Sequence, residues 1–264
     1  MDGMAAETGA PRPVSDPRSA DPACISRVAT DRRIFALLAA VGLFRLFLAA
    51  RLELSPDEAY YWTWSLRIAP GYYDHPPAIA ALIAGGTRLL GHSPIGVRIG
   101  PVVLGLATAW LLYRTSLTLF RSPSRALFTL VVMLALPLST VGGVLATPDA
   151  PLVFGWALWL WGSMRSAVEG GRHGRWSIGL GIGIACLAKY TGYWLIPVTL
   201  LSYLFSSRGR PRFLIHLPGL GLAGVAIWVN LNWNLHHDWA SIRFQFNHGL
   251  SSSCLLYTSD AADE

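Results

Sequence analysis

Three acids and a histidine, Asp57, Glu58, Asp74 and His75, lie in one short stretch between apolar segments, from Leu54 to Pro77. Aromatic residues are interleaved with them: Tyr60, Tyr61, Trp62, Trp64, Tyr72 and Tyr73. A carboxylate can take the proton of an attacking hydroxyl, and a nearby cation can stabilise a phosphate. Aromatic rings suit a membrane interface, where ionisable groups usually serve a function. We therefore predict that this loop forms the floor of a polar reaction chamber.

A structural role accounts for Glu58 more fully than for Asp57. Ser55-Pro56-Asp57-Glu58 is the pattern of a helix start, with Ser55 as N-cap and Glu58 as its reciprocal partner in a capping box. Capping explains Glu58 at least as well as catalysis does. For Asp57 the structural alternative is interaction with the helix dipole. We assign Asp57 as general base, because desolvation beside aromatic rings would make its carboxylate a stronger proton acceptor.

A second group of candidates lies outside this loop. Thr147-Pro148-Asp149 repeats the helix-start pattern with Thr147 as N-cap, so Asp149 is either a helix-start residue or a second acid. Lys189 is either an interfacial lysine that extends toward water or a phosphate ligand. His75 is either a hydrogen-bonding loop residue or a cation for a phosphate. The residues that we assign to substrate and phosphate binding are Asp74, His75, Lys189 and Arg243.

A metal site is an alternative at His236-His237-Asp238 with His248, since imidazole and carboxylate are suitable ligands. Adjacent histidines on an interfacial loop are more often solvated, so we predict no metal there and no cofactor. Gly219-Leu-Gly-Leu-Ala-Gly224 matches a dinucleotide-binding fingerprint literally, but no strand precedes it. Close helix packing by small residues is the better interpretation for it, and also for Gly179 and Gly183.

Composition places these candidates in a membrane protein. Of the 264 residues, 53% are hydrophobic and only 14% are charged, which is unusual for a soluble domain. The net charge of +6 comes from short arginine clusters between apolar runs, as the positive-inside rule predicts. No basic stripe or recognition helix indicates nucleic acid. The three cysteines lie far apart and indicate neither a disulfide framework nor a zinc site.

The apolar runs predict an all-α, polytopic membrane helical bundle. We expect spans near 34–52, 95–117, 126–145, 150–167 and 213–233, and short interfacial helices over 55–67 and 78–90 in the first loop. Arg32 and Arg33 place the N-terminus in the cytoplasm and this loop outside. Arginines flank 176–207 on both sides, so we predict a hairpin of two short helices there, with Lys189 at its external turn.

The two ends of the chain differ in composition from the part between them. Residues 1–33 are rich in Pro, Ala, Asp and Arg, which predicts a disordered cytosolic tail. Residues 34–250 form the predicted transmembrane part. Residues 251–264 resemble translated vector sequence, so we expect a non-native tail on an N-terminal fragment of a longer enzyme.

Five motifs occur in a recognisable order: Asp57-Glu-Ala-Tyr-Tyr-Trp62, Gly71-Tyr-Tyr-Asp-His-Pro-Pro77, Thr147-Pro-Asp149, Leu187-Ala-Lys-Tyr-Thr-Gly192 and Asn232-Trp-Asn-Leu-His-His-Asp-Trp-Ala-Ser241. Together they resemble bacterial family 39 and family 83 glycosyltransferases. These are membrane enzymes of the GT-C type, and they include aminoarabinose and galacturonic acid transferases and protein mannosyltransferases. The resemblance covers about Ile34 to Gly249.

The resemblance implies a GT-C-like fold that transfers a sugar, with inversion, from a polyprenyl-phosphate carrier. The implied acceptor is a lipid, glycan or protein of the cell envelope, such as lipopolysaccharide, at the external face of the bacterial inner membrane. Asp57 matches an acid thought to act as base or to orient the acceptor, and Asp149 matches a second acidic position. His75 and Tyr60 depart from the aminoarabinose branch, which carries lysine and arginine there.

Two other functions are compatible with parts of this pattern. A transporter would also carry ionisable groups within the membrane and helices broken by Gly or Pro. The sequence shows no evident inverted repeat, and its acids cluster outside the predicted spans. An inactive, truncated fragment of the enzyme is the third possibility.

Overall fold

The fold is that of a computed structural model, which describes residues 32–206 and 209–250. The predicted tails, 1–33 and 251–264, lie outside the described residues except for Arg32 and Arg33. These two arginines begin helix α2 (Arg32–Arg51), so the predicted tail overlaps α2 by two residues.

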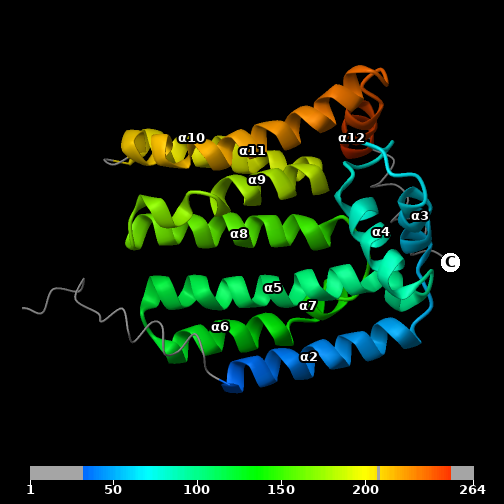
Figure 1. The fold of residues 1–264 in the computed structure, drawn as a ribbon, viewed down its shortest axis with the longest axis horizontal. Helices are drawn as coiled ribbons and strands as arrows, with labels where there is room; N and C mark the ends of the chain where they lie inside the picture. The colour runs from blue at the N-terminus through cyan, green and yellow to red at the C-terminus, as the bar shows by residue number, and fades with distance from the viewer. Residues whose placement is uncertain (1–31, 207–208, 251–264) are drawn as a thin grey trace, which may run out of the picture.

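The described chain is an all-α membrane helical bundle, as predicted, and contains no β-strand. Long and medium helices run back and forth beside one another (Figure 1): α2 (Arg32–Arg51), α5 (Pro94–Phe120), α6 (Pro123–Ala135), α8 (Asp149–Val168), α9 (Ser177–Ala188), α10 (Leu195–Phe205) and α11 (Gly209–Leu235). The shorter elements are α3 (Pro56–Ser65), α4 (Ala78–Leu90), α7 (Pro137–Gly142), α12 (Ala240–Leu250), η1 (Gly171–Gly174) and η2 (Tyr190–Trp194). Of these, α3, α4 and α12 gather at one end of the bundle, on the right in Figure 1, which we call the α3 end.

Three helices of the described chain are long and apolar enough to cross a membrane: α2, α5 and residues Phe213–Leu235 of α11. The predicted helix over 126–145 is wrong as a single span. Pro137 has no backbone N–H to continue the α-helical ladder, and Leu136 before it is extended, with φ −64° and ψ 128°. The segment is therefore divided into α6 and the short α7. The predicted span 150–167 corresponds to α8, which is not among the three.

The predicted hairpin between the arginine clusters is confirmed. Helix α9 ends at Ala188, Lys189 is extended, the short helix η2 makes the turn, and α10 returns. Both outer ends of this hairpin therefore lie at the end of the bundle opposite α3 (Figure 1). Lys189 consequently lies at the α3 end.

The two predicted helix starts differ in how they are capped. For α3, the capping box is confirmed, since Ser55 Oγ accepts from the Glu58 N–H at 3.3 Å and the Ser55 N–H donates to Glu58 Oε2 at 3.0 Å. For α8, the predicted cap by Thr147 is wrong. Pro148 already has helical backbone angles and precedes the helix without a side-chain cap, and only the Thr147 carbonyl accepts a bond, from Ala150 N–H.

Small residues bring helices close together, as predicted for Gly179 and Gly219. A Cβ at Gly179 would overlap the backbone of Gly219, so α9 and α11 touch through their main chains. By contrast, a Cβ at Gly221 or Gly224 would meet nothing within 4 Å. The glycine pattern in α11 therefore serves helix packing on the side of Gly219 only.

Candidate active site

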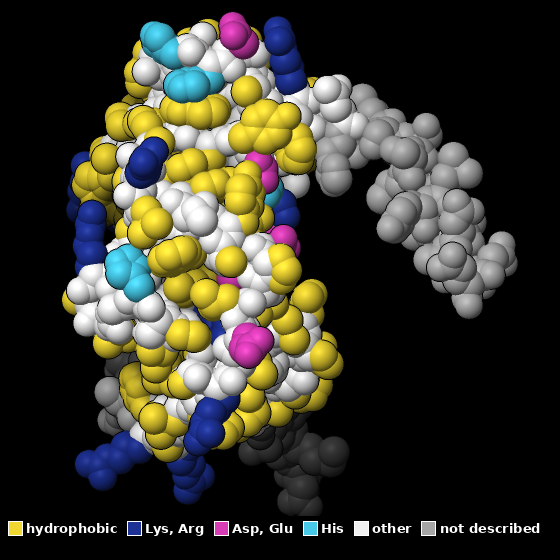
Figure 2. Space-filling view, turned by 90° about the vertical axis from the view of Figure 1, so that its right-hand side faces the viewer, with side chains coloured by type: hydrophobic (Ala, Val, Ile, Leu, Met, Phe, Trp, Pro, Cys, Tyr) yellow, Lys and Arg dark blue, Asp and Glu magenta, His cyan; other side chains and the backbone are white. Residues whose placement is uncertain are grey.

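The α3 end of the bundle collects most of the predicted site residues. Asp57 comes from the start of α3, Asp74 and His75 from the following loop, Asp149 from the start of α8, and Lys189 from the residue after α9. Figure 2 looks onto this end, where acidic, basic and histidine side chains are scattered over a largely hydrophobic surface. The two Pro-Asp helix starts, at Asp57 and Asp149, lie at the same end of the molecule.

Tyr61 lies close enough to all three aspartates to be influenced by their charges. Its side chain is buried, and its ring centroid is 6.1 Å from that of His75. Burial, and then the negative charges of Asp57, Asp74 and Asp149, raise the pKa of Tyr61 to about 12. The phenol therefore stays protonated at neutral pH and can donate a hydrogen bond into a cluster of carboxylates.

Asp149 and Lys189 form an ion pair at the edge of this cluster. Lys189 Nζ donates to Asp149 Oδ1 at 2.9 Å, and the two side chains are 31% and 54% exposed. An ion pair this exposed contributes little stability, at most about 1 kcal/mol. The contact therefore serves chiefly to hold a cation beside the carboxylates in a place that a substrate can reach.

His75 is half-buried and differs from the expectation of a cation. Burial and the positive charge of Lys189 lower the pKa of His75, although Asp74 and Asp149 act in the opposite direction. Its Nδ1 is buried and has no hydrogen-bond partner among the described residues. At neutral pH, His75 is therefore an uncharged imidazole with an unused ring nitrogen, suited to a hydrogen bond rather than to a charge contact.

Asp74 is fixed from two directions. The Tyr60 hydroxyl donates to Asp74 Oδ1 at 3.0 Å, and Gln245 Nε2 donates to the Asp74 carbonyl at 2.7 Å. Burial, followed by this hydrogen bond and the charge of Asp74, raises the pKa of Tyr60 to about 12. Asp74 is thus tied both to α3 and to α12.

Asp57 is the least engaged of the three aspartates. Its side chain is exposed and makes no hydrogen bond or ion pair with any described residue. We expected the protein to desolvate Asp57, but its exposed side chain is not desolvated by the protein itself. Its carboxylate is nevertheless free to accept a proton from a ligand.

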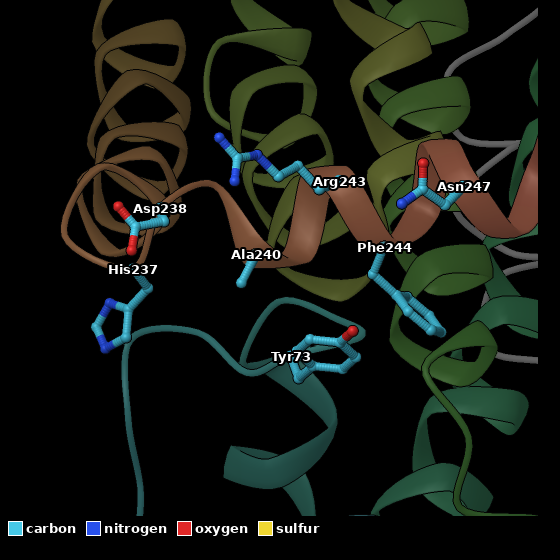
Figure 3. A pocket seen from close by; sticks show the side chains of 7 residues that line it. All are labelled: Tyr73, His237, Asp238, Ala240, Arg243, Phe244 and Asn247. Atoms are coloured by element: carbon cyan, nitrogen blue, oxygen red, sulfur yellow. The ribbon is translucent and has the colours of Figure 1, made fainter.

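Arg243 lines a separate pocket beside this cluster, with a volume of about 500 Å³ (Figure 3). The pocket lies between the first loop and α12, and its lining residues are Tyr73, His237, Asp238, Ala240, Arg243, Phe244 and Asn247. Asp238 and Trp239 join α11 to α12 in left-handed conformations, with φ 53° and 58°, which are costly for a tryptophan. Neither Lys189 nor His75 lines this pocket, although Tyr73 directly precedes Asp74.

The histidines near this pocket are engaged with the backbone. The Nδ1 atoms of His236 and His237 lie 2.8 and 2.7 Å from the carbonyls of Asn232 and Trp233. No group of metal-binding side chains occurs in the described part of the chain, which does not include the side chain of His248.

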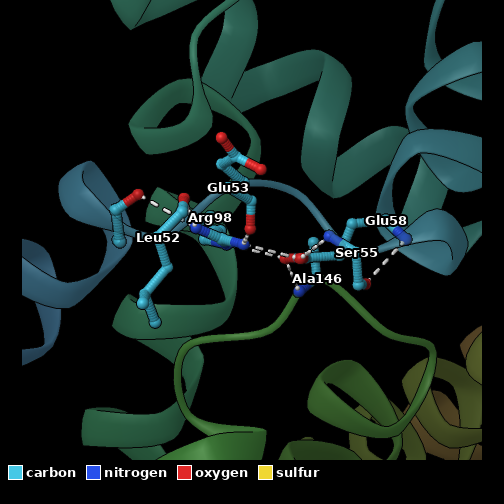
Figure 4. Close-up of polar contacts among 7 residues, drawn as sticks. Leu52, Glu53, Ser55, Glu58, Arg98 and Ala146 are labelled. Carbon is cyan, nitrogen blue, oxygen red and sulfur yellow. Dashed lines mark hydrogen bonds and ion pairs between the residues drawn. The ribbon is translucent and has the colours of Figure 1, made fainter.

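Asp57 is exposed, whereas Glu58 points into the bundle, where it meets Arg98 of α5 (Figure 4). Arg98 Nε and Nη2 donate to the two carboxylate oxygens, each at 2.7 Å. The remaining guanidinium N–H groups donate to the carbonyls of Ala49, Leu52 and Glu53 at 3.1, 2.7 and 2.6 Å. All five donors of Arg98 are therefore used.

The Glu58 carboxylate is equally saturated. Besides Arg98, it accepts bonds from the backbone N–H of Ser55 at 3.0 Å and of Ala146 at 2.9 Å. Burial alone would raise the pKa of Glu58, but the hydrogen bonds from Arg98, Ala146 and Ser55 outweigh it and hold the pKa below its ordinary value. No acceptor site is left for a substrate, so this geometry favours the structural role of Glu58 over the catalytic one.

Arg98 is the residue that the sequence analysis missed. It is 1% exposed and connects the end of α2, the start of α3 and, through Glu58, the backbone just before α8. A single arginine inside an apolar run, away from the arginine clusters, was the available signal, because such residues are expensive in a membrane and usually have a partner.

Residues 74–233 match the family of dolichyl-phosphate-mannose-protein mannosyltransferases. The chain is also similar to the lipid A galacturonosyltransferase RgtD of Rhizobium johnstonii, with 30% identity over 188 residues. That similarity covers 71% of this chain but 40% of the relative. No solved structure matches the chain. The family match includes Asp74, His75, Asp149 and Lys189, and it begins after Asp57.

Proposed function

This chain belongs to the dolichyl-phosphate-mannose-protein mannosyltransferase family, and on that premise we propose that it transfers a sugar from a polyprenyl-phosphate carrier to an acceptor. Dolichyl phosphate is itself a polyprenyl phosphate, so the family name supports this class of donor. The observation that carries the proposal is the gathering of Asp57, Asp74, Asp149 and Lys189 around Tyr61, at one end of an apolar bundle.

The proposed reaction needs a base for the acceptor proton and stabilisation of the leaving phosphate. A hydroxyl oxygen of the acceptor attacks the anomeric carbon, the carbon–oxygen bond to the phosphate breaks, and the electron pair of that bond leaves with the phosphate. The hydroxyl proton must go to a base, and the departing phosphate needs positive charge or hydrogen-bond donors. The phosphate needs no proton to leave. Attack from the face opposite the phosphate inverts the configuration of the sugar.

We assign the base to Asp57, whose exposed carboxylate has no other partner among the described residues. Lys189 stabilises the leaving phosphate by its charge, and neutral His75 does so through a hydrogen bond from its ring. Asp149 is the second acid and holds Lys189 in place. Arg243, in its own pocket, would contact a more distant part of a substrate.

We propose a lipid as the acceptor ahead of a glycan or a protein. The support is the name of the relative, which acts on lipid A, a membrane lipid of the bacterial cell envelope. The same name suggests an acidic hexose as the sugar. The chain covers less than half of that relative, so both assignments carry the activity of a longer protein over to a chain that matches part of it.

We place the reaction at the extracytoplasmic face of the bacterial inner membrane, with the N-terminus in the cytoplasm. Arginines gather at the end opposite α3, as the positive-inside rule requires for the cytoplasmic side. Single cysteines introduced at positions 57 and 149 should both react with a membrane-impermeant reagent added outside. Reaction of the two positions from opposite sides of the membrane would refute this topology.

The direct test is transfer by the full chain in membrane vesicles that contain labelled polyprenyl-phosphate sugars. Label should move to lipid, and Asp57→Asn should abolish the transfer while membrane insertion stays normal. Glu53→Gln is the matched control, because Glu53 is an exposed acid in the same region and lies outside the cluster. Activity of Asp57→Asn within a few-fold of the wild type would reject Asp57 as base.

The transporter alternative loses support, because the three aspartates of the candidate site lie at one end of the bundle and the family is one of transferases. Ion-driven uptake of a solute without any transfer of label would restore it. A chain that inserts in the membrane but neither transfers nor transports would be the inactive fragment.

A further inference from the structure

A second cavity, with a volume of about 610 Å³, lies between α5, the broken pair α6–α7, and α8. We call it the α7 groove. Its lining residues are Gly105, Thr108, Met133, Leu136, Leu138, Ser139, Val141, Gly142, Gly143, Leu145, Thr147, Asp149, Ala150 and Val153. The volume falls within the range of ligand pockets, roughly 300–1,000 Å³.

The groove exists because of the local sequence around α7. Pro137 breaks the helix, and glycines at positions 142 and 143 leave that wall without side chains. A Cβ at Gly142 would meet nothing within 4 Å, so the space in front of this residue is empty. The remaining wall residues are mostly apolar, as a hydrocarbon chain requires.

One end of the groove is polar and belongs to the candidate active site. Asp149 lines the groove and also forms the ion pair with Lys189, at 2.9 Å. Thr147 lies beside it in the lining. The groove is therefore amphipathic, with an apolar body that leads to a carboxylate of the reaction cluster.

The charge of the lining indicates which kind of lipid fits. Asp149 is its only charged residue, and no lysine, arginine or histidine is part of it. Arg45 lies behind Gly105 and Gly143, is 1% exposed, and donates to the Ser139 carbonyl at 2.9 Å. Asp149 is 54% exposed and can accept a hydrogen bond from a hydroxyl, whereas a phosphate is better placed on the side of its ion-pair partner, Lys189.

We propose that the α7 groove holds a hydrocarbon chain of the lipid acceptor, which places a hydroxyl of its head group at Asp149. This inference rests on the proposed function, since it takes the acceptor to be a lipid. The carrier phosphate then approaches from the side of Lys189 and His75, so that donor and acceptor meet at the aspartates.

The test fills the groove without disturbing the fold. Gly142→Leu places a side chain in empty space, and Gly224→Leu is the matched control, because a Cβ at Gly224 in α11 also meets nothing within 4 Å. The full chain is placed in phosphatidylcholine vesicles with an alkyl glucoside that carries a photoactivatable group in its chain. We expect cross-links to peptides from α7 and α8, reduced several-fold in Gly142→Leu and unchanged in Gly224→Leu.

Three outcomes would overturn the proposal. The first is equal labelling of Gly142→Leu and the wild type. The second is displacement of the glucoside by a long-chain polyprenyl phosphate, which would assign the groove to the carrier. The third is equal labelling by a photoactivatable phosphatidylcholine, which would mean that bulk lipid fills it. Cross-linking requires no sugar transfer, so it can be repeated in Asp57→Asn, and a failed transfer assay would leave this result intact.

Discussion

Replacing Glu58 by glutamine should destabilise the folded chain more than most single substitutions. The carboxylate is fully buried and accepts four hydrogen bonds, two of them from Arg98. Glutamine keeps the size of the side chain but removes the charge and turns one acceptor into a donor, which then faces N–H groups. Arg98, itself 1% exposed, loses the only counter-ion that it has among the described residues.

The expected cost follows from what is left behind. Breaking a buried ion pair from one side costs about 3–5 kcal/mol, because the remaining charge stays buried without compensation. Glu58→Gln should lower the free energy of unfolding in mixed detergent micelles by that amount. Glu53→Gln, an exposed acid nearby, should change it by no more than about 0.5 kcal/mol.

A double-mutant cycle makes the reasoning refutable. If Glu58 acts mainly through Arg98, the double variant Glu58→Gln, Arg98→Gln should be less destabilised than the sum of the single variants, by about 0.5–3 kcal/mol. Additive losses would show that the two side chains act independently. A Glu58→Gln chain as stable as the wild type would refute the ion pair as a source of stability altogether.

The pH dependence of stability gives the same contact a second readout. Hydrogen bonds hold the pKa of Glu58 below its ordinary value of 4.5 in the folded chain. The contribution of Glu58 is therefore fully present above pH 4.5 and is lost as pH falls through the lower, folded-state pKa. Glu58→Gln should remove this part of the acid sensitivity.

Three further predictions concern other contacts. Lys189→Gln should slow transfer roughly 100-fold through loss of phosphate stabilisation while changing the free energy of unfolding by at most about 1 kcal/mol; equal stability and equal rate would remove Lys189 from the site. Gly179→Ala should lower the thermal midpoint, since overpacking costs about 1–3 kcal/mol, whereas Gly224→Ala should not, and similar midpoints would contradict the glycine contact between α9 and α11. Asp57→Asn should lower the pKa of Tyr61 from about 12, which ultraviolet titration measures with Tyr61→Phe as the reference. The raised pKa favours the protonated phenol. The stability that Tyr61 contributes is therefore present below pH 10 and is lost as pH rises through about 12.

The parts of the fold that were predictable from sequence depend on local patterns. The capping box of α3 needs only four consecutive residues, and Ser55 and Glu58 have the required types. The hairpin at Lys189 follows from arginines on both sides of one apolar run. The number of helices between Asp57 and Asp149 then predicts that both residues lie at the same end of the bundle.

The parts that were missed depend on contacts between distant residues. Arg98 lies 40 positions from Glu58, and no local pattern connects them. Hydrophobicity alone also does not reveal a break: 126–145 is mostly apolar and carries no charge, but Pro137 divides it and thereby opens the α7 groove. Arg243 was grouped with the phosphate ligands because it lies on the predicted external side; it lines the pocket between the first loop and α12, and its role stays a prediction.

Asp57 and Glu58 divide their tasks because they are neighbours at the start of a helix. Successive helical residues point about 100° apart, so the geometry that buries Glu58 against Arg98 turns Asp57 outward. The bond from Ala146 N–H to Glu58 also fixes the backbone three residues before Asp149. Glu58 therefore sets the separation of the two aspartates without contacting a substrate itself. It follows that Asp57→Asn should abolish transfer at unchanged stability, whereas Glu58→Gln should lower both together. Loss of stability in Asp57→Asn, or full transfer by a folded Glu58→Gln chain, would contradict this division.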